Sequence, residues 1–289
     1  MNRRYFLFLF SAAAGGDFLF GSETPKTLLR YGFKKGEELH WNVLHTLKMK
    51  TIIGGREENI ETRSRAVKIW KTLDVDKQGR AVFEYRVEDV DMHRSQSGED
   101  DAVYNSCRDK TIPPEFINLT GKLGVPLARI KIDPQGHTTK QPIREYEGSI
   151  SENRIVIPLP DEPMDVGSTW SEPAQIDLPQ PNQTVKKIRI RHEFTLEKIQ
   201  SGLATVQFAT LIFTPLTPKE ESQLLEHFSA GTMNLDLQAG HFIRHQATID
   251  RQMVGVEGAA DSIRYLSRIT ECCCGRSACE ICSVRGVPN

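Results

Sequence analysis

Hydrophobic and polar residues alternate with a period of two along most of the chain, which predicts β-strands. The clearest stretch runs from Val67 to Val87, where two alternating runs flank a turn at residues 76–79. A second stretch around Gly202 has the same spacing when it is aligned on Gly79 without a gap. The matched positions are Ala81 with Ala204, Phe83 with Val206, Tyr85 with Phe208, Val87 with Thr210, Val67 with Ile190, Ile69 with His192 and Leu73 with Leu196. Because a slip of one residue would turn every core side chain to solvent, the shared phase predicts a duplicated antiparallel sheet.

Shorter patterns predict the remaining elements. Residues 28–50 are expected to form a strand pair, followed by a reversal at 52–55, and the polar residues 94–111 are expected to form a long exposed loop. Alternation over Ala128–Ile132 leads into a turn at 133–136, and residues 235–241 repeat this strand and turn. One short helix is predicted from Pro218, capped by Thr217 and Glu220, with about three turns before Gly231.

These elements predict a mainly β protein made of two related antiparallel halves, packed as a sandwich or as a curved open sheet resembling a half-barrel. The first half covers residues 27–145 and the second covers residues 161–270. Between them, residues 146–160 form a linker with one strand at 154–159. A segment at 1–22 precedes the halves and a Cys-rich tail at 271–289 follows them, after a last strand predicted at 263–269.

The second half opens with a Pro-rich entry and the run Asp165-Val166-Gly167-Ser168-Thr169-Trp170, which parallels the region of Gly36 and Trp41 in the first half. This layout, followed by paired strands around a glycine turn, resembles a group of uncharacterised exported bacterial β-proteins. The resemblance covers most of residues 28–270 and implies export and a β architecture. It implies no catalytic activity.

The first residues have the layout of an export signal. Arg3 and Arg4 directly precede an apolar run that ends in the small residues 11–16, and the sequence from Asn2 to Leu7 resembles the twin-arginine motif of bacteria. An ordinary signal peptide is the alternative, and an uncleaved N-terminal tether is a further one. Each of these predicts export to the periplasm or cell envelope of a bacterium, with the export machinery as a partner and no other transmembrane segment.

Composition narrows the classes of function. The formal net charge is -1 and charges of both signs are interspersed, so nucleic acid is not an expected partner. The catalytic motifs of serine hydrolases, zinc peptidases and nucleotide-binding enzymes do not occur in the sequence. A binding protein is therefore favoured over an enzyme.

Five of the six cysteines lie in the tail, at Cys272, Cys273, Cys274, Cys279 and Cys282, and the sixth is Cys107. Three interpretations remain open for them. Disulfides suit an oxidising compartment, with Cys107 as a partner that ties the tail to the body. A metal is the second, because the spacing from Cys274 through Cys279 to Cys282 occurs in iron-sulfur proteins, although a fourth ligand is missing downstream. Reactive thiols are the third. No other cofactor is predicted.

Histidines offer a weaker metal hypothesis. His241 and His245 would share one face of a strand, with Ile243 between them, and His137 occupies the repeat position of His241. Polar residues at the exits of turns are the alternative.

The leading function is a noncatalytic binding or carrier protein for a hydrophobic small molecule or an envelope protein, with Phe83, Tyr85, Val206 and Phe208 lining its cleft or core. A structural envelope protein cross-linked through the tail and an exported redox or metal protein are the alternatives.

Overall fold

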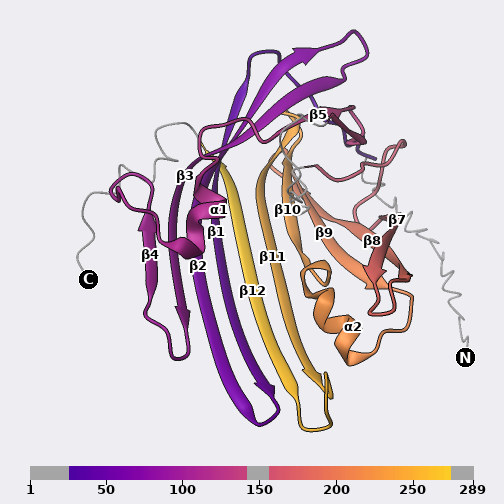
Figure 1. Ribbon diagram of the computed structural model, residues 1–289. Coiled ribbons are helices and arrows are strands. Elements are labelled where there is room, and N and C mark those ends of the chain that lie inside the picture. The colour runs from indigo at the N-terminus through magenta and orange to yellow at the C-terminus, as the bar shows by residue number, and fades with distance from the viewer. Residues whose placement is uncertain (1–25, 142–155, 275–289) are drawn as a thin grey trace, which may run out of the picture.

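The strands of the described residues form one open antiparallel sheet that curves strongly (Figure 1). The computed structural model describes residues 26–141 and 156–274. The strands are β1 (Glu38–Ile53), β2 (Arg56–Val75), β3 (Ala81–Gln96), β4 (Ala102–Asn105), β5 (Ala128–Ile132), β6 (Thr138–Gln141), β7 (Thr169–Pro179), β8 (Val185–Gln200), β9 (Leu203–Ile212), β10 (Ala230–Asp236), β11 (His241–Val254) and β12 (Ser262–Cys274). The predicted mainly β class is confirmed, and of the two predicted arrangements the curved open sheet is the one that forms.

The order of the strands keeps the two sequence halves as separate blocks. It runs β6-β5-β3-β2-β1-β12-β11-β10-β9-β8-β7, with β4 paired to β3 beside the main path. The last strand of the second half therefore pairs with the first strand of the first half, β12 with β1. Within the described residues β6 and β7 remain the edges, so the sheet does not close on itself.

The two hairpins matched in sequence have matching burial. Ala81 and Ala204 are both fully buried at the start of the returning strand, and Phe83 and Val206 are buried two residues later. Each hairpin also has an irregular register in its first strand at nearly the same place, between residues 72 and 74 in β2 and between residues 196 and 198 in β8. In the returning strands the shared alternation therefore brings matched positions to the same face. In the first strands the predicted match is wrong by one residue, because Thr72 pairs with Phe83 whereas Leu196, the match of Leu73, pairs with Val206. The second turn is one residue shorter, since Ala81 pairs with Val75 and Ala204 pairs with Ile199.

The predicted helix begins where its capping residues indicate but ends early. Helix α2 (Pro218–Gln223) has Thr217 as N-cap, and Thr217 and Glu220 form the reciprocal capping box. A short 3₁₀ turn, η2 (Leu225–His227), follows it, and Gly231 lies inside β10 and does not end a helix. Leu224 and Leu225 are buried against the sheet, so α2 and η2 lie over its concave side. The remaining helical turns are η1 (Pro114–Phe116) and α1 (Ile117–Thr120).

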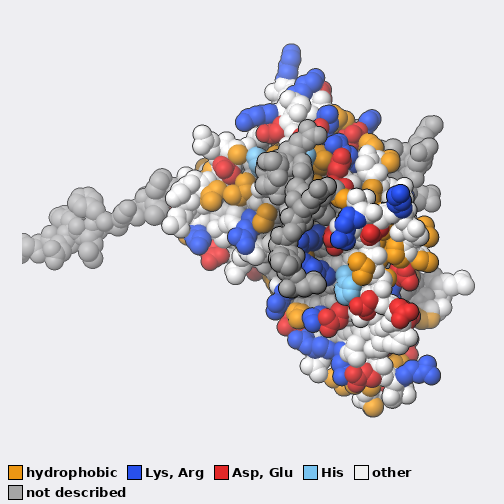
Figure 2. Space-filling model, turned by 90° about the vertical axis from the view of Figure 1, so that its left-hand side faces the viewer, with side chains coloured by type: hydrophobic (Ala, Val, Ile, Leu, Met, Phe, Trp, Pro, Cys, Tyr) orange, Lys and Arg blue, Asp and Glu red, His pale blue; other side chains and the backbone are white. Residues whose placement is uncertain are grey.

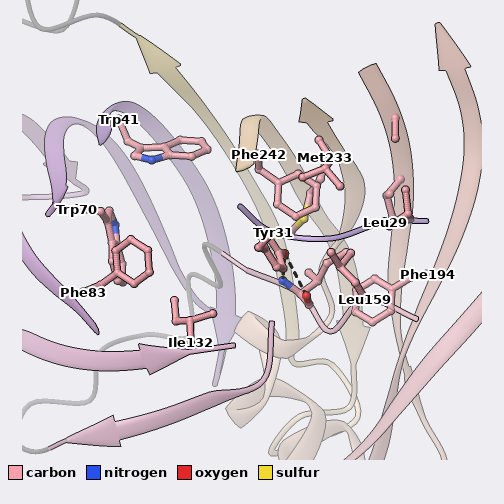
Figure 3. Packing of buried hydrophobic residues seen from close by; sticks show 14 of the residues in the cluster. Leu29, Tyr31, Trp41, Trp70, Phe83, Ile132, Leu159, Phe194, Met233 and Phe242 are labelled. Atoms are coloured by element: carbon pink, nitrogen blue, oxygen red, sulfur yellow. Dashed lines mark hydrogen bonds between the residues drawn. The ribbon is translucent and has the colours of Figure 1, made fainter. Parts of the chain in front are cut away.

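The main core fills one end of the curved sheet, where two extended segments cross it (Figure 3). Leu29 and Tyr31 come from the segment before β1, and Ile157 and Leu159 from the segment before β7; all four are buried. The Tyr31 hydroxyl donates to the Ile157 carbonyl at 3.0 Å and accepts from the Ile157 amide at 2.9 Å. The two crossing segments are therefore joined inside the core.

Repeat-related turns hold these crossing segments in place. The Tyr31 amide donates to the Pro134 carbonyl in the β5–β6 turn, and the Gly32 amide donates to the Gly240 carbonyl in the β10–β11 turn. Gly136 and Gly240 both have positive φ, and a Cβ on either would lie within 2.4 Å of backbone atoms of the opposing segment. Glycine is therefore required at both turns by conformation and by the close approach of a second chain segment.

Three sequence predictions on local structure are wrong. Residues 28–33 are not the first strand of a pair, and residues 156–159 are not a strand; both are core-crossing segments. Alternate side chains face inward in such a segment as they do in a strand, so the sequence pattern is the same. Residues 94–111 are not a long loop, because β3 extends to Gln96 and pairs with β4. The residues at 154–155 lie outside the described part.

The outer surface carries mixed charge. Figure 2 shows Lys and Arg side chains interspersed with Asp and Glu over one face, with scattered hydrophobic side chains between them. Among the described residues no helix is both long and apolar enough to span a membrane.

Candidate functional site

A cavity of about 370 Å³ lies on the concave side of the sheet, beside the main core. Strands β1, β8, β9, β10, β11 and β12 form its walls, and η2 with the residues after it lines another side. Its apolar lining residues are Ile157, Phe194, Phe208, Met233, Ala247, Ile249 and Ile269. Its polar lining residues are His45, His192, Thr210, Glu226, His227, Ser229, His245, Tyr265 and Ser267. The site is therefore amphipathic.

Strand β12 places alternate residues along the cavity. Tyr265, Ser267 and Ile269 line it, and Glu271 follows two residues later on the same face. The directly paired neighbours of Glu271 are Val43 on β1 and His245 on β11. A strand that was predicted to end at 269 thus continues to Cys274 and places a buried carboxylate beside His245, which lines the cavity.

A bulge in β11 decides which histidine enters the cavity. Asn234 is opposite Arg244 but Leu235 is opposite Phe242, so Ile243 is an extra residue in β11. Phe242 and His245 are consequently both buried, whereas a regular strand would have placed His241 and His245 on one face. The predicted pair of same-face histidines is wrong for this reason.

The deepest polar groups form a buried chain of three residues. Lys68 Nζ lies 2.7 Å from Glu271 Oε1, and His245 Nδ1 lies 2.9 Å from Glu271 Oε2. Lys68 reaches Glu271 from β2 across the neighbouring strand β1. A second, much smaller void of about 10 Å³ also borders this network and is walled by Trp41, Trp70 and other residues.

The protonation state of Glu271 follows from these contacts. Burial alone would raise the pKa of this carboxyl, but the Lys68 ammonium and the hydrogen bond from His245 outweigh it and bring the pKa to about 2. Glu271 is therefore ionised at neutral pH and accepts hydrogen bonds from both neighbours. Its charge is balanced by that of Lys68.

A second polar group lies nearer to η2. His45 Nε2 is 2.9 Å from Ser267 Oγ, and Tyr265 also hydrogen-bonds to Ser267. Burial lowers the pKa of His45, a shift that Glu226 partly opposes. Burial and the nearby Glu226 carboxylate raise the pKa of Tyr265. His45 and Tyr265 are therefore held in their neutral forms, as hydrogen-bonding rather than charged groups.

The predicted cleft residues divide between core and cavity. Phe208 lines the cavity and lies with its ring centroid 5.4 Å from that of His245. Phe83, Tyr85 and Val206 are buried in the main core instead. The sequence interpretation missed Lys68 and Glu271, although an ionisable residue at an inward position of an alternating strand is a signal for a functional site.

The predicted cysteine site is only partly within the described residues. Cys107 lies in the exposed turn after β4, with its Sγ 3.6 Å from Asp89 Oδ1. Cys272 and Cys273 are free thiols on β12, and Cys274 is the last residue of that strand. Burial raises the pKa of the Cys273 thiol to about 11. Cys279 and Cys282 lie outside the described part, as do Arg3 and Arg4, so the disulfide, metal and export predictions remain predictions.

Although four histidines line the cavity, the described residues contain no group of three or more His, Cys, Asp or Glu side chains arranged to hold a metal ion. The described cavity can therefore bind a ligand through hydrogen bonds to its polar lining residues and through contact with its apolar lining residues.

Comparisons with known proteins add little to this geometry. No protein-family model matches the chain, and no curated protein matches it. Among solved structures, the chain is similar to DynF from the dynemicin biosynthesis pathway of Micromonospora chersina, with 6% sequence identity, 89% of each chain covered and a TM-score of 0.22. A similarity this low does not define a shared function.

Proposed function

We propose that this protein is a noncatalytic binding or carrier protein for a hydrophobic small molecule, which it holds in the cavity on the concave side of its sheet. The cavity itself carries the proposal. Its volume of about 370 Å³ falls in the range of roughly 300–1,000 Å³ that small-molecule sites occupy. A ligand of a few hundred daltons fits that space.

The residues that line the cavity suit a ligand site more than a filled protein core. Phe194, Phe208 and Ile249 supply apolar contact, while His45 and His245 supply polar groups at fixed places. Most of these residues come from adjacent paired strands, so their positions are set by the hydrogen-bond ladder before any ligand arrives. Such preorganised sites bind without paying the entropy of ordering a loop.

The export signal predicted from Arg3 and Arg4 supports a location outside the cytoplasm. A carrier there would take up a poorly soluble molecule and shield its apolar surface from water.

Native mass spectrometry of the exported protein, purified without refolding and measured before and after reduction, tests the proposal. We expect an adduct of a few hundred daltons that is lost on denaturation. A bare monomer would contradict the carrier function, and an oligomer lost on reduction would favour the structural alternative. The mass of the mature chain also reports whether and where the leader is removed.

Two substitutions on neighbouring residues of β11 localise the adduct. Ala247 is buried and lines the cavity, whereas Thr248 points to the opposite, exposed face. A247W should fill the cavity and abolish the adduct, and T248W should keep it. Because a large residue can also disturb packing, A247L provides a milder test with a smaller expected loss, and circular dichroism checks the fold of each variant.

A further inference from the structure

His245 is buried but uses only one of its two ring nitrogens within the described residues. The residue is 8% exposed and borders the large cavity. Its Nδ1 atom is hydrogen-bonded to Glu271, and no described residue hydrogen-bonds to Nε2. Nε2 is not among the fully buried unpartnered atoms of the described residues, so it is accessible from the cavity. A polar atom held in this way at a cavity wall is available to a ligand atom.

The tautomer of His245 follows from its neighbour. An ionised Glu271 carboxylate only accepts hydrogen bonds, so Nδ1 must be the donor. In the neutral imidazole the proton is then on Nδ1, and Nε2 carries the lone pair. The group offered to the cavity is a hydrogen-bond acceptor in a fixed position.

The balance of charge disfavours an anionic ligand head at this point. Lys68 and Glu271 already neutralise each other at 2.7 Å. Within the described residues that line the large cavity there is no Lys or Arg, and its one carboxylate, Glu226, belongs to an exposed residue on η2. A carboxylate or phosphate head would thus be buried without a counter-ion, which is costly. Among the described lining residues, the counter-ion for a cationic head would be the exposed Glu226 carboxylate and not a buried group beside His245.

We infer that the ligand has a neutral hydroxyl head, a phenol or an alcohol, which donates a hydrogen bond to His245 Nε2. Its apolar body lies against Phe194, Phe208 and Ile249. His245 is the residue that selects the head group, and Glu271 positions it by fixing the tautomer. This inference rests on the proposed binding function and names the chemical class of the ligand.

Binding of naphthalene probes that share one apolar body tests the inference with the wild-type protein. The probes are 2-naphthol, its methyl ether 2-methoxynaphthalene, the carboxylate 2-naphthoate and the amine 2-naphthylmethylamine, each titrated by its own fluorescence. The ether and the acid cannot donate a hydroxyl hydrogen bond at neutral pH, so they leave Nε2 without a partner. We expect 2-naphthol to bind about tenfold or more tightly than the ether, since an unpaired buried acceptor has a cost of that order.

Two variants assign the effect to His245. H245F keeps a ring of similar size and should lower the ratio of naphthol to ether affinity to about one. Q246F introduces the same side chain at the next residue of β11, on the exposed face, and should keep the wild-type ratio. The wild-type ratio needs no variant, so the inference remains testable if H245F does not fold.

The outcomes separate this inference from the function on which it rests. If no probe binds, the proposed binding function fails and the inference fails with it. If naphthol and ether bind equally well, the apolar site stands and the assignment of the head group is wrong. Tightest binding of the naphthoate or of the amine would also overturn the assignment.

Discussion

The buried ion pair between Lys68 and Glu271 makes a prediction about stability. Glu271 is 4% exposed, and both of its oxygens are hydrogen-bonded. The substitution E271Q removes the charge with little change in shape and leaves the Lys68 ammonium buried without a counter-ion. Removing one partner of a buried pair typically costs about 3–5 kcal/mol. We expect E271Q to lower the free energy of unfolding at pH 7 by an amount in that range.

The pKa of Glu271 gives a second, independent magnitude. It falls from 4.5 in the unfolded reference to about 2 in the folded protein. At about 1.36 kcal/mol per pKa unit, this shift of about 2.5 units corresponds to about 3 kcal/mol. Because the folded pKa is the lower one, this stabilisation is fully present above about pH 4.5 and is lost as the pH falls toward 2. About 2 kcal/mol of it should be lost between pH 7 and pH 3.

Urea unfolding followed by tryptophan fluorescence at pH 7 and at pH 3 measures both effects. The difference between wild type and E271Q should shrink by about 2 kcal/mol at the lower pH. Glu61 provides the matched control, because it pairs with Lys48 at 2.9 Å on the surface. E61Q should cost less than about 1 kcal/mol. A loss of under about 1 kcal/mol for E271Q at pH 7, or a difference that is the same at both pH values, would refute the reasoning.

Four further outcomes follow from other contacts. Tyr31→Phe leaves the amide and carbonyl of Ile157 without partners and should cost about 1–3 kcal/mol in urea unfolding. Gly136→Ala forces a Cβ to 2.2 Å from the Ile157 carbonyl oxygen and should prevent stable folding or cost several kcal/mol, whereas Gly202→Ala, also at positive φ but in open space, should cost only about 1–3 kcal/mol. Burial raises the pKa of Cys273 to about 11, so alkylation of this thiol at pH 8 should be slow in the folded protein and fast in urea, as mass spectrometry of its peptide would show. Lys68→Met combined with Glu271→Met should cost less than the sum of the two single changes, because no unpaired charge remains; additive costs would contradict the pairing.

Much of the sheet is predictable from alternation alone. Alternation after the turns at Gly79 and Gly202 predicts the phase of the two returning strands, and the observed burial of Ala81 and Ala204 agrees with that phase. Alternation does not say whether an extended segment has strand neighbours, so the segment around Tyr31 was predicted as a strand. Its partners are core side chains and turn carbonyls more than 100 residues away, as the 126-residue separation between Tyr31 and Ile157 illustrates.

The candidate site was less predictable because it depends on a break in the pattern. The bulge at Ile243 changes the face on which the preceding residues of β11 lie relative to His245, and no pattern in the sequence predicts this bulge. Glu271 immediately precedes three consecutive cysteines, and it was therefore assigned to the predicted Cys-rich tail and not to the last strand. Phe208 was predicted as a cleft residue and lines the cavity, but its neighbour in the pattern, Val206, is in the core. Positions that fill a core and positions that line a cavity have the same period, so only the packing distinguishes them.

The buried hydrogen-bonded network of Lys68, Glu271 and His245 indicates what kind of ligand the cavity would bind. An apolar set of residues in place of Lys68, Glu271 and His245 would often be as stable or more stable, since the desolvation of buried charges offsets most of their attraction. Stability alone therefore does not explain their presence beside the cavity, which His245 lines. The ion pair contributes no net charge, yet it fixes the orientation of His245 and leaves one acceptor atom open toward the cavity. A wall built in this way favours a neutral, hydroxyl-bearing ligand over an ionised one, and that preference is what the naphthalene probes measure.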